Sequence, residues 1–139
     1  MMMQELTGGC QCGAIRYTVS GDATHASLCH CADCRKSAGA PFVHWVAYGE
    51  HEVAISQGEP KTFASSPGVT RSFCPTCGTG LFYTNPQVLP GLIDVQAATL
   101  DDPDAVPPQA QIMTRERLGW VPGINGLPAF KAYPGMDED

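Results

Sequence analysis

Three short stretches, each holding two or three cysteines, decide the fold of this chain: Cys10-Gln11-Cys12, Cys29-His30-Cys31-Ala32-Asp33-Cys34 and Cys74-Pro75-Thr76-Cys77. They contain all seven cysteines of the 139 residues. Cysteines two or three positions apart can bind one ion, because a tight turn aims both sulfurs the same way. Where no export signal is present, such clusters favour metal binding over disulfides. Seven thiols suggest one complete four-cysteine site and one three-cysteine site with a coordination place left open.

The third stretch has the form of a zinc knuckle. In such turns backbone N–H groups after the first cysteine point at its sulfur, and a following glycine lets the turn close. A knuckle supplies two ligands and needs two more from elsewhere in the chain. We therefore expect Cys10 and Cys12 to complete a structural zinc site with Cys74 and Cys77. Structural zinc stabilises small domains by on the order of 10 kcal/mol.

The middle stretch predicts a different kind of site. Cys29, Cys31 and Cys34 can face one ion and leave its fourth position to water or substrate, which is typical of catalytic zinc. One alternative is a second closed site completed by a histidine. His44 can approach such a site, whereas His30 projects away from its neighbours on an extended strand. Another alternative is a redox dithiol, since Cys31 and Cys34 form a Cys-x-x-Cys pair.

The composition excludes several classes of partner. The formal charge is -6, and no basic stripe offsets it, which argues against nucleic acid. The start, Met1 to Glu5, lacks the features of a signal peptide, and no stretch approaches the roughly 20 apolar residues of a membrane span. We therefore expect a cytoplasmic protein without a membrane partner. The ending, residues 136–139, predicts a solvated acidic tail.

The length predicts a single domain, residues 1–139, with a core from about residue 5 to about residue 130. Fifteen glycines and twelve prolines favour turns and short strands over long helices. Alternation of apolar and polar residues and β-branched runs predict a mainly β fold with strands at 14–20, 42–48, 52–56, 61–65, 69–73, 81–83 and 92–97. A short helical turn is expected at 32–38. Trp45 and Trp120 are expected in the core.

The ordered set of motifs resembles a known family. The matching stretches are Gly8–Tyr17, Cys29–Lys36, Gly39–Phe42, Arg71–Thr79, Ile93–Val95 and Leu100–Pro103. Together they span roughly residues 7 to 120 and resemble the glutathione-dependent formaldehyde-activating family, which shares its domain with centromere protein V. One departure from the family pattern is Gln111-Ile112, where members commonly carry His-Ile.

The resemblance implies a β-tent of short antiparallel sheets clamped by two zinc ions. It assigns the structural ion to Cys10, Cys12, Cys74 and Cys77. It assigns the catalytic ion to Cys29, Cys31 and Cys34. The family's reaction joins glutathione and formaldehyde into S-hydroxymethylglutathione, and it is classed in reverse as that of a carbon–sulfur lyase. The expected partners are a small-molecule thiol and an aldehyde, and the oligomeric state stays open, with a homodimer as one option.

Four further residues are candidates for the site. Arg35 and Lys36 follow the middle cluster and can pair with a carboxylate of a peptide-like thiol, or they are simply solvated. His44 can shuttle a proton near neutral pH, or it is a structural histidine on its strand. Arg71 is expected to support a thiolate cluster. Because thiols add to formaldehyde readily without a catalyst, a non-catalytic, zinc-stabilised binding module is the alternative function.

Overall fold

The computed structural model describes residues 5–136, and its fold is mainly β, as predicted. The strands are β1 (Glu5–Gly9), β2 (Arg16–Ser20), β3 (His25–Cys29), β4 (Val43–Gly49), β5 (Val53–Gln57), β6 (Lys61–Ser66), β7 (Val69–Phe73), β8 (Gly80–Thr84), β9 (Leu92–Gln96) and β10 (Ala110–Ile112). The α-helix is α1 (Ala32–Ala38), at the predicted position, and the short 3-10 turns are η1 (Glu50–Glu52), η2 (Ala97–Thr99), η3 (Thr114–Glu116) and η4 (Val121–Gly126).

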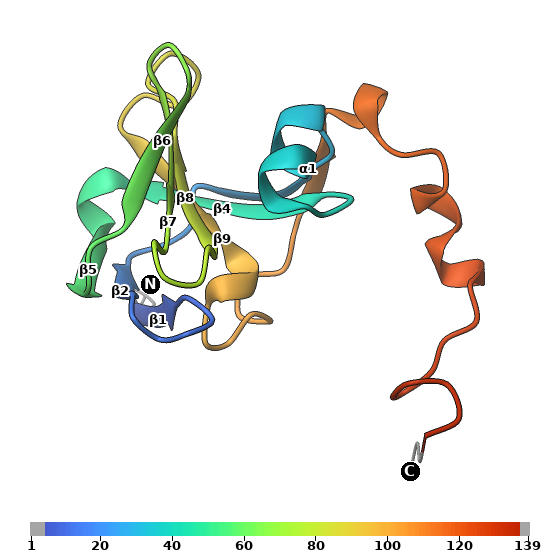
Figure 1. Cartoon of the computed structure of the whole chain (residues 1–139). Coiled ribbons are helices and arrows are strands. Elements are labelled where there is room, and N and C mark those ends of the chain that lie inside the picture. Colours follow the sequence, from blue (N-terminus) through green and yellow to red (C-terminus); the bar gives the residue numbers. More distant parts are fainter. Residues whose placement is uncertain (1–4, 137–139) are drawn as a thin grey trace.

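The strands form two sheets (Figure 1). The smaller sheet has the order β1-β2-β5, and the larger has the order β10-β3-β4-β9-β8-β7-β6. All pairings are antiparallel except that of β10 with β3, which is parallel. The expected short antiparallel sheets are thus present, with one parallel pair added at the edge of the larger sheet. The physical reason is the long connection between β9 and β10. It carries the chain back along the sheet, so that β10 joins the open edge of β3 and runs in the same direction as β3.

The core lies between the two sheets and holds the predicted apolar face of β2. Ile15, Tyr17 and Val19 are all buried. The Tyr17 ring packs edge-on against Phe82 of the larger sheet, with ring centroids 5.1 Å apart. Tyr17 also lies so close to Gly8 of β1 that a side chain at residue 8 would collide with it. Glycine at residue 8 therefore lets the small sheet close over the tyrosine.

The helix α1 lies at one end of β4, on the side of the molecule away from the small sheet (Figure 1). It begins after Cys31, whose Sγ accepts a hydrogen bond from the backbone N–H of Cys34 at 3.3 Å. It ends at Gly39, which adopts a left-handed conformation with φ 65°. The sequence of this short helix thus folds two cysteines of the middle stretch onto one turn.

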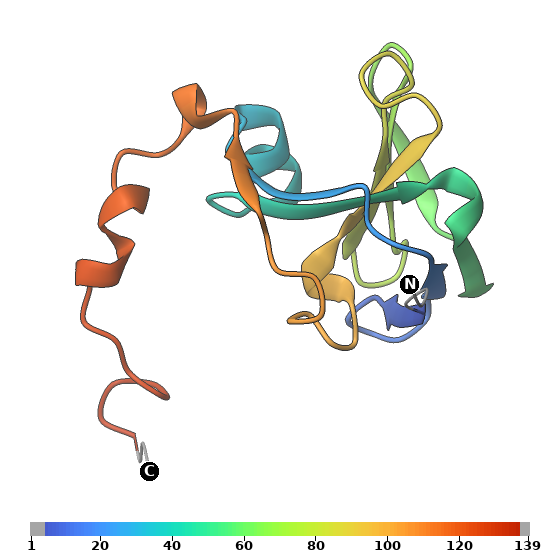
Figure 2. The same cartoon turned by 180° about the vertical axis from the view of Figure 1, so that it is seen from behind.

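The chain leaves the compact body after η3 and runs away from it (Figure 2). Val121 is buried, but residues 122–136 are all exposed. Trp120, expected in the core, is 53% exposed, so that prediction was wrong. Aromatic character alone does not show whether a segment reaches the core. Of the predicted acidic tail, residues 137–139 lie outside the described residues. Among residues 5–136, no helix has the length and apolar character that crossing a membrane requires.

Candidate metal centres and substrate cavity

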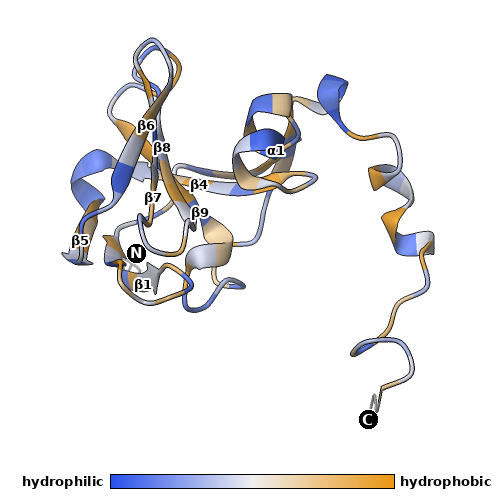
Figure 3. Cartoon of the chain, viewed as in Figure 1, coloured by the Kyte–Doolittle hydropathy of each residue, from blue (hydrophilic) through white to orange (hydrophobic). Residues whose placement is uncertain are grey.

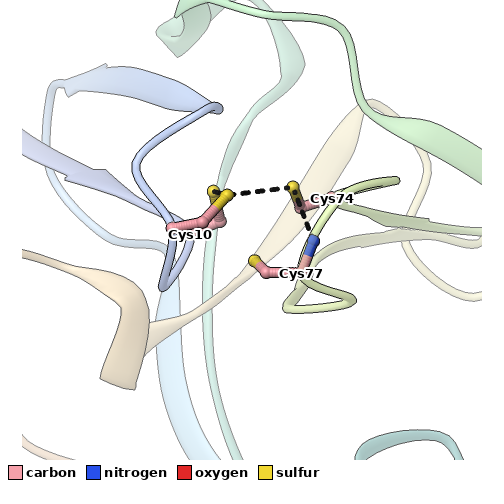
Figure 4. Close-up of side chains that lie close together, drawn as sticks. Cys10, Cys74 and Cys77 are labelled. Carbon is pink, nitrogen blue, oxygen red and sulfur yellow. Dashed lines mark hydrogen bonds between the residues drawn. The ribbon is translucent and has the colours of Figure 1, made fainter.

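The loop between β1 and β2 faces the loop between β7 and β8, and each contributes two cysteines. Figure 4 shows Cys10 from the first loop opposite Cys74 and Cys77 from the second. The Sγ atoms of Cys10, Cys12, Cys74 and Cys77 all lie within 4.8 Å of one another. The Cys10 and Cys12 sulfurs are 3.7 Å apart, and those of Cys12 and Cys74 are 3.8 Å apart.

These separations fit a tetrahedral ion. Zinc bound to thiolates has a Zn–S distance of about 2.3 Å, which places neighbouring sulfurs of a tetrahedron about 3.8 Å apart. All seven cysteines of the chain are free thiols. The four-cysteine cluster (Cys10, Cys12, Cys74, Cys77) can therefore hold a metal ion without any rearrangement of its loops.

Backbone hydrogen bonds support the sulfurs of the four-cysteine cluster. The N–H groups of Thr76 and Cys77 each donate to the Cys74 Sγ at 3.4 Å, the pattern that the knuckle motif predicts. The N–H of Ile15 donates to the Cys10 Sγ at 3.2 Å. Gly78 closes the knuckle with φ 81°, a conformation that favours glycine. Because these donors belong to the backbone, the loops themselves stabilise thiolate charge.

Thr79 joins the two loops of this cluster. Its hydroxyl oxygen accepts a hydrogen bond from the backbone N–H of Gln11 at 3.1 Å. The same oxygen lies 3.2 Å from the Cys77 Sγ, and this hydrogen bond is the main cause that lowers the pKa of Cys77 to about 5. Cys77 is thus ready to serve as a thiolate ligand at neutral pH.

The three-cysteine cluster (Cys29, Cys31, Cys34) forms where β3 passes into α1. Cys29 ends the strand, Cys31 caps the helix and Cys34 lies in its first turn, and their Sγ atoms are within 4.8 Å of one another. No histidine or carboxylate among residues 5–136 joins either cysteine cluster. The donor set, three thiols in one small volume, fits a zinc ion with one further position.

Arg71 on β7 is the cation beside this cluster. Its Nη2 lies 3.7 Å from the Cys34 Sγ and 3.6 Å from a carboxylate oxygen of Asp33. Its guanidinium stacks over the Tyr83 ring, 4.8 Å from the ring centroid, and the residue is only 8% exposed. Hydrogen bonds from Cys29 first, and also from Cys31 and Arg71, lower the pKa of Cys34 to about 5. The hydrogen bond with Cys34 raises the pKa of Cys29, and burial raises the pKa of Cys31, so Cys34 is the one of these three thiols that favours the thiolate form.

The segment around β10 supports the loop that carries the cysteines. The backbone N–H of His30 donates to the carbonyl of Ile112 at 3.1 Å, and the His30 Nε2 lies 2.8 Å from the Oε1 of Gln111. The backbone N–H of Ala32 donates to the Glu116 carboxylate at 3.0 Å. Gln111, whose role the sequence left open, thus positions the buried His30.

A cavity of about 570 Å³ is lined by Trp45 and Arg71, which contact the three-cysteine cluster, but none of the three cysteines is part of its wall. Its walls include Asp33, Lys36, Trp45, Phe63, Arg71 and Phe82. Trp45 also packs against the buried cysteines of the cluster. The cavity therefore joins an apolar wall to two cations, and it has room for a small organic molecule.

The structure brings only some of the expected substrate residues to this cavity. Lys36 lines it, whereas Arg35 uses its Nε to donate to the His30 carbonyl at 3.3 Å and lies outside. His44 neighbours Trp45 on β4, and alternation along the strand turns it to the opposite face of the sheet. Burial lowers the pKa of His44, and its Nε2 has no hydrogen-bond partner among the described residues.

Sequence reasoning did not assign Asp94, Tyr83 and Glu116 to the site. Asp94 pairs with Ala47 and Tyr83 across the sheet, so it lies on the face of β9 that carries the cluster. Burial, and then the negative charge of Cys34, raises its pKa to about 7. A carboxylate inside an apolar run was the available signal, but its neighbours depend on strand order, which the sequence does not show.

Comparisons with known proteins identify a family, a relative named as a lyase and a shared fold. The family model described as glutathione-dependent formaldehyde-activating enzyme matches residues 5–116. A protein of Schizosaccharomyces pombe named as an uncharacterized lyase is 35% identical over 85 residues. That match covers 60% of this chain and 61% of the relative, so the chain spans about three-fifths of the relative's length. A crystal structure of a Rhodobacter sphaeroides protein has a TM-score of 0.62 at 20% identity, covers 76% of this chain and 99% of that chain, and shows a shared fold.

Proposed function

This chain belongs to the glutathione-dependent formaldehyde-activating enzyme family, and we propose that it is a zinc-dependent enzyme of the carbon–sulfur lyase type. Its substrates in this proposal are a small thiol of the glutathione class and formaldehyde or a related aldehyde. The family and the lyase-named relative support this type of function. The individual substrates are part of the proposal.

The observation that carries the proposal is the position of the three-cysteine cluster. Trp45 and Arg71 separate it from a cavity large enough for a small molecule, and it lacks a fourth protein ligand among the described residues. The four-cysteine cluster has its full set of thiols and is held by backbone donors. Chemistry is therefore assigned to the first cluster and support of the fold to the second.

In this proposal Cys29, Cys31 and Cys34 hold a catalytic zinc ion, and the four-cysteine cluster holds a structural one. A zinc ion in the catalytic position supplies a positive charge that favours the thiolate form of a bound thiol near neutral pH. Arg71 shares its charge with the Cys34 sulfur, so that this ligand stays ionised. Tyr83 stacks on the same guanidinium and holds it in place.

The reaction adds a thiol across a carbonyl. A bond forms between the thiol sulfur and the aldehyde carbon, the C=O π bond breaks, and the thiol proton ends on the former carbonyl oxygen. The side chains of the cavity orient the thiol for this step. The ammonium group of Lys36 is suited to a carboxylate of a peptide-like thiol, while Trp45 and Phe82 form an apolar wall for its carbon atoms.

The test is a rate measurement, because thiols add to formaldehyde without a catalyst. Exchange NMR on mixtures of glutathione and formaldehyde measures interconversion with the adduct, with and without the zinc-loaded protein. We expect exchange above the spontaneous rate, and no acceleration by Cys31→Ser. Binding of glutathione without acceleration would instead identify a carrier or binding module. Absence of both acceleration and binding would overturn the proposal.

A further inference from the structure

The C-terminal arm (residues 118–136) lies beyond the residues that match the family and exposes large apolar side chains. These are Trp120 (53% exposed), Ile124 (45%), Leu127 (58%), Phe130 (53%), Tyr133 (77%) and Met136 (57%). Figures 1 and 2 show the arm running away from the compact body. Its backbone hydrogen bonds are local turns, such as that from the Leu127 N–H to the Ile124 carbonyl.

The arm does not have the composition of a solvated tail. Lys131 is the single charged residue between residues 118 and 136. Disordered segments are typically polar and charged, whereas this arm repeats an apolar residue every three or four positions. Figure 3 shows apolar colour on η4 and along the arm beyond it. An apolar segment of this kind favours packing against another surface.

A cavity of about 520 Å³ lies at the base of the arm (the basal cavity). Its apolar walls come from the body and from the first turn of the arm: Leu28, Phe42, Pro108, Val121, Pro122 and Ile124. One continuous surface therefore carries both a hollow and, further along the arm, protruding apolar side chains. A two-fold symmetric contact requires such a self-complementary surface, because each copy presents the same patch to the other.

We propose that the arm packs on a second copy of this chain, so that the arm of each copy covers the basal cavity of the other. Leu127 and Phe130 are the side chains best placed for this contact, because they follow the turn that lines the cavity. A copy's own arm is poorly suited to fill its own cavity. Ile124 already forms part of the wall, and the residues after it lead away from the body.

The apolar area supports a stable contact. The exposed parts of three aromatic and three aliphatic side chains amount to on the order of 500 Å² per arm, judged from the roughly 150–250 Å² that a whole aromatic side chain can bury. Two arms together with the walls they cover reach the range of about 1,200–2,000 Å² that is typical of specific interfaces. The arm brings only one charged residue, Lys131, to the contact, and Arg117 is the charged residue in the wall of the basal cavity that it would cover.

The test uses the full chain in sedimentation velocity at protein concentrations of roughly 1 to 100 μM, the range in which micromolar contacts dissociate. We expect a dimer for the native chain and a monomer for the double variant Leu127→Glu/Phe130→Glu. Val88→Glu is the matched control. Val88 is 71% exposed on the turn between β8 and β9, outside the arm, and its substitution is expected to leave the dimer intact.

Two results would overturn the proposal. One is a native chain that sediments as a monomer at every concentration. Protection of the arm from hydrogen exchange in that monomer would then show that the arm packs on its own chain. The other is a double variant that remains dimeric, which would put the interface elsewhere. Zinc content, measured on the same samples, is expected to be equal in all variants. It separates loss of the dimer from loss of the fold.

Discussion

The two cysteine clusters use one ligand type but differ in what surrounds the sulfurs. In the four-cysteine cluster, N–H groups of the loop backbones donate to sulfur, as at Cys74. In the three-cysteine cluster one backbone N–H, that of Cys34, donates to Cys31, but the neighbouring cation is a side chain, Arg71, which also lines the cavity. Backbone donors are fixed by the fold, whereas side-chain donors can be changed without refolding. This difference supports the proposed division, in which the first cluster stabilises the fold and the second takes part in the chemistry.

The largest expected effect comes from breaking the four-cysteine cluster. Cys74→Ser removes the completely buried ligand that receives two backbone hydrogen bonds. Structural zinc contributes on the order of 10 kcal/mol, which is comparable with the whole stability of a domain. We expect the variant to be unfolded at room temperature by circular dichroism and size exclusion. A variant that keeps its native spectrum and full zinc content would show that the cluster does not carry the fold.

The matching change in the three-cysteine cluster is expected to spare the fold. Cys31→Ser removes one of the three thiols of this cluster, and the serine can still cap α1. Zinc content is expected to fall by one ion per chain, with the far-ultraviolet spectrum unchanged. If Cys31→Ser unfolds the chain as Cys74→Ser does, the division into a structural and a chemical cluster is wrong.

Arg71→Met tests the side-chain support directly. Loss of the guanidinium leaves the Cys34 thiolate without its cation, so we expect the three-cysteine cluster to bind zinc about 10–100-fold more weakly. A competing chelator measures this affinity. Arg115→Met, which removes the same charge at an exposed position, is the control. Equal zinc affinity in the two variants would show that Arg71 does not support zinc binding by the three-cysteine cluster.

A smaller effect is expected from Lys36→Gln. The lysine lines the cavity but is exposed, and an exposed pairing with a carboxylate stabilises a complex only modestly. We expect KM for glutathione to rise about two- to fivefold, by the roughly 0.4–1 kcal/mol of such a pair, with kcat unchanged. Lys61→Gln, on β6, serves as the control. A change in kcat with constant KM would assign Lys36 a different role.

The smallest effect concerns an ion pair that belongs to neither cluster. Arg16, and to a lesser degree Thr7, lowers the pKa of Asp101 to about 2. A carboxyl whose pKa is lowered by folding adds stability above its ordinary pKa of about 4, and this contribution is lost as pH falls toward 2. Asp101→Asn is therefore expected to lower stability slightly, and by the same amount at pH 5.5 and pH 8. Urea unfolding measures the free energy of unfolding of the variant and of the native chain. If the difference between the two changes from pH 5.5 to pH 8, the lowered pKa of Asp101 is not its cause.

Much of the fold could be predicted from sequence because strands leave a local signal. Alternation at Ile15, Tyr17 and Val19 predicted β2 and its buried face, and Gly39 marked the end of α1. The strand β1 was missed since it ends in two glycines, and β10 since it has three residues and all are exposed. The strand β3 was missed as well, since the adjacent Ala26 and Ser27 are both buried and give no alternating pattern. The parallel pairing of β10 depends on the path of a long connection, which no local pattern encodes.

The residues of the candidate site could also be predicted only in part. Cysteine spacing predicts which thiols can share a turn, and the resemblance assigned them to two ions. The sequence could not place Lys36 inside the cavity and His44 outside it, because that depends on which face of β4 is covered. The Glu116 carboxylate accepts a hydrogen bond from the N–H of Ala32, which lies 84 residues away in the sequence. No spacing rule could find this contact.

The most direct test of the account is the absorption spectrum of the cobalt-substituted protein, with two cobalt ions per chain, titrated with glutathione. Thiolate-bound cobalt reports its coordination, and only a site with a free position can change when a thiol arrives. We predict that glutathione alters the bands of one cobalt ion, and that Cys31→Ser, which keeps the four-cysteine cluster, shows no change. A spectrum that glutathione leaves unchanged, with both ions present, would contradict the claim that the three-cysteine cluster is open to substrate.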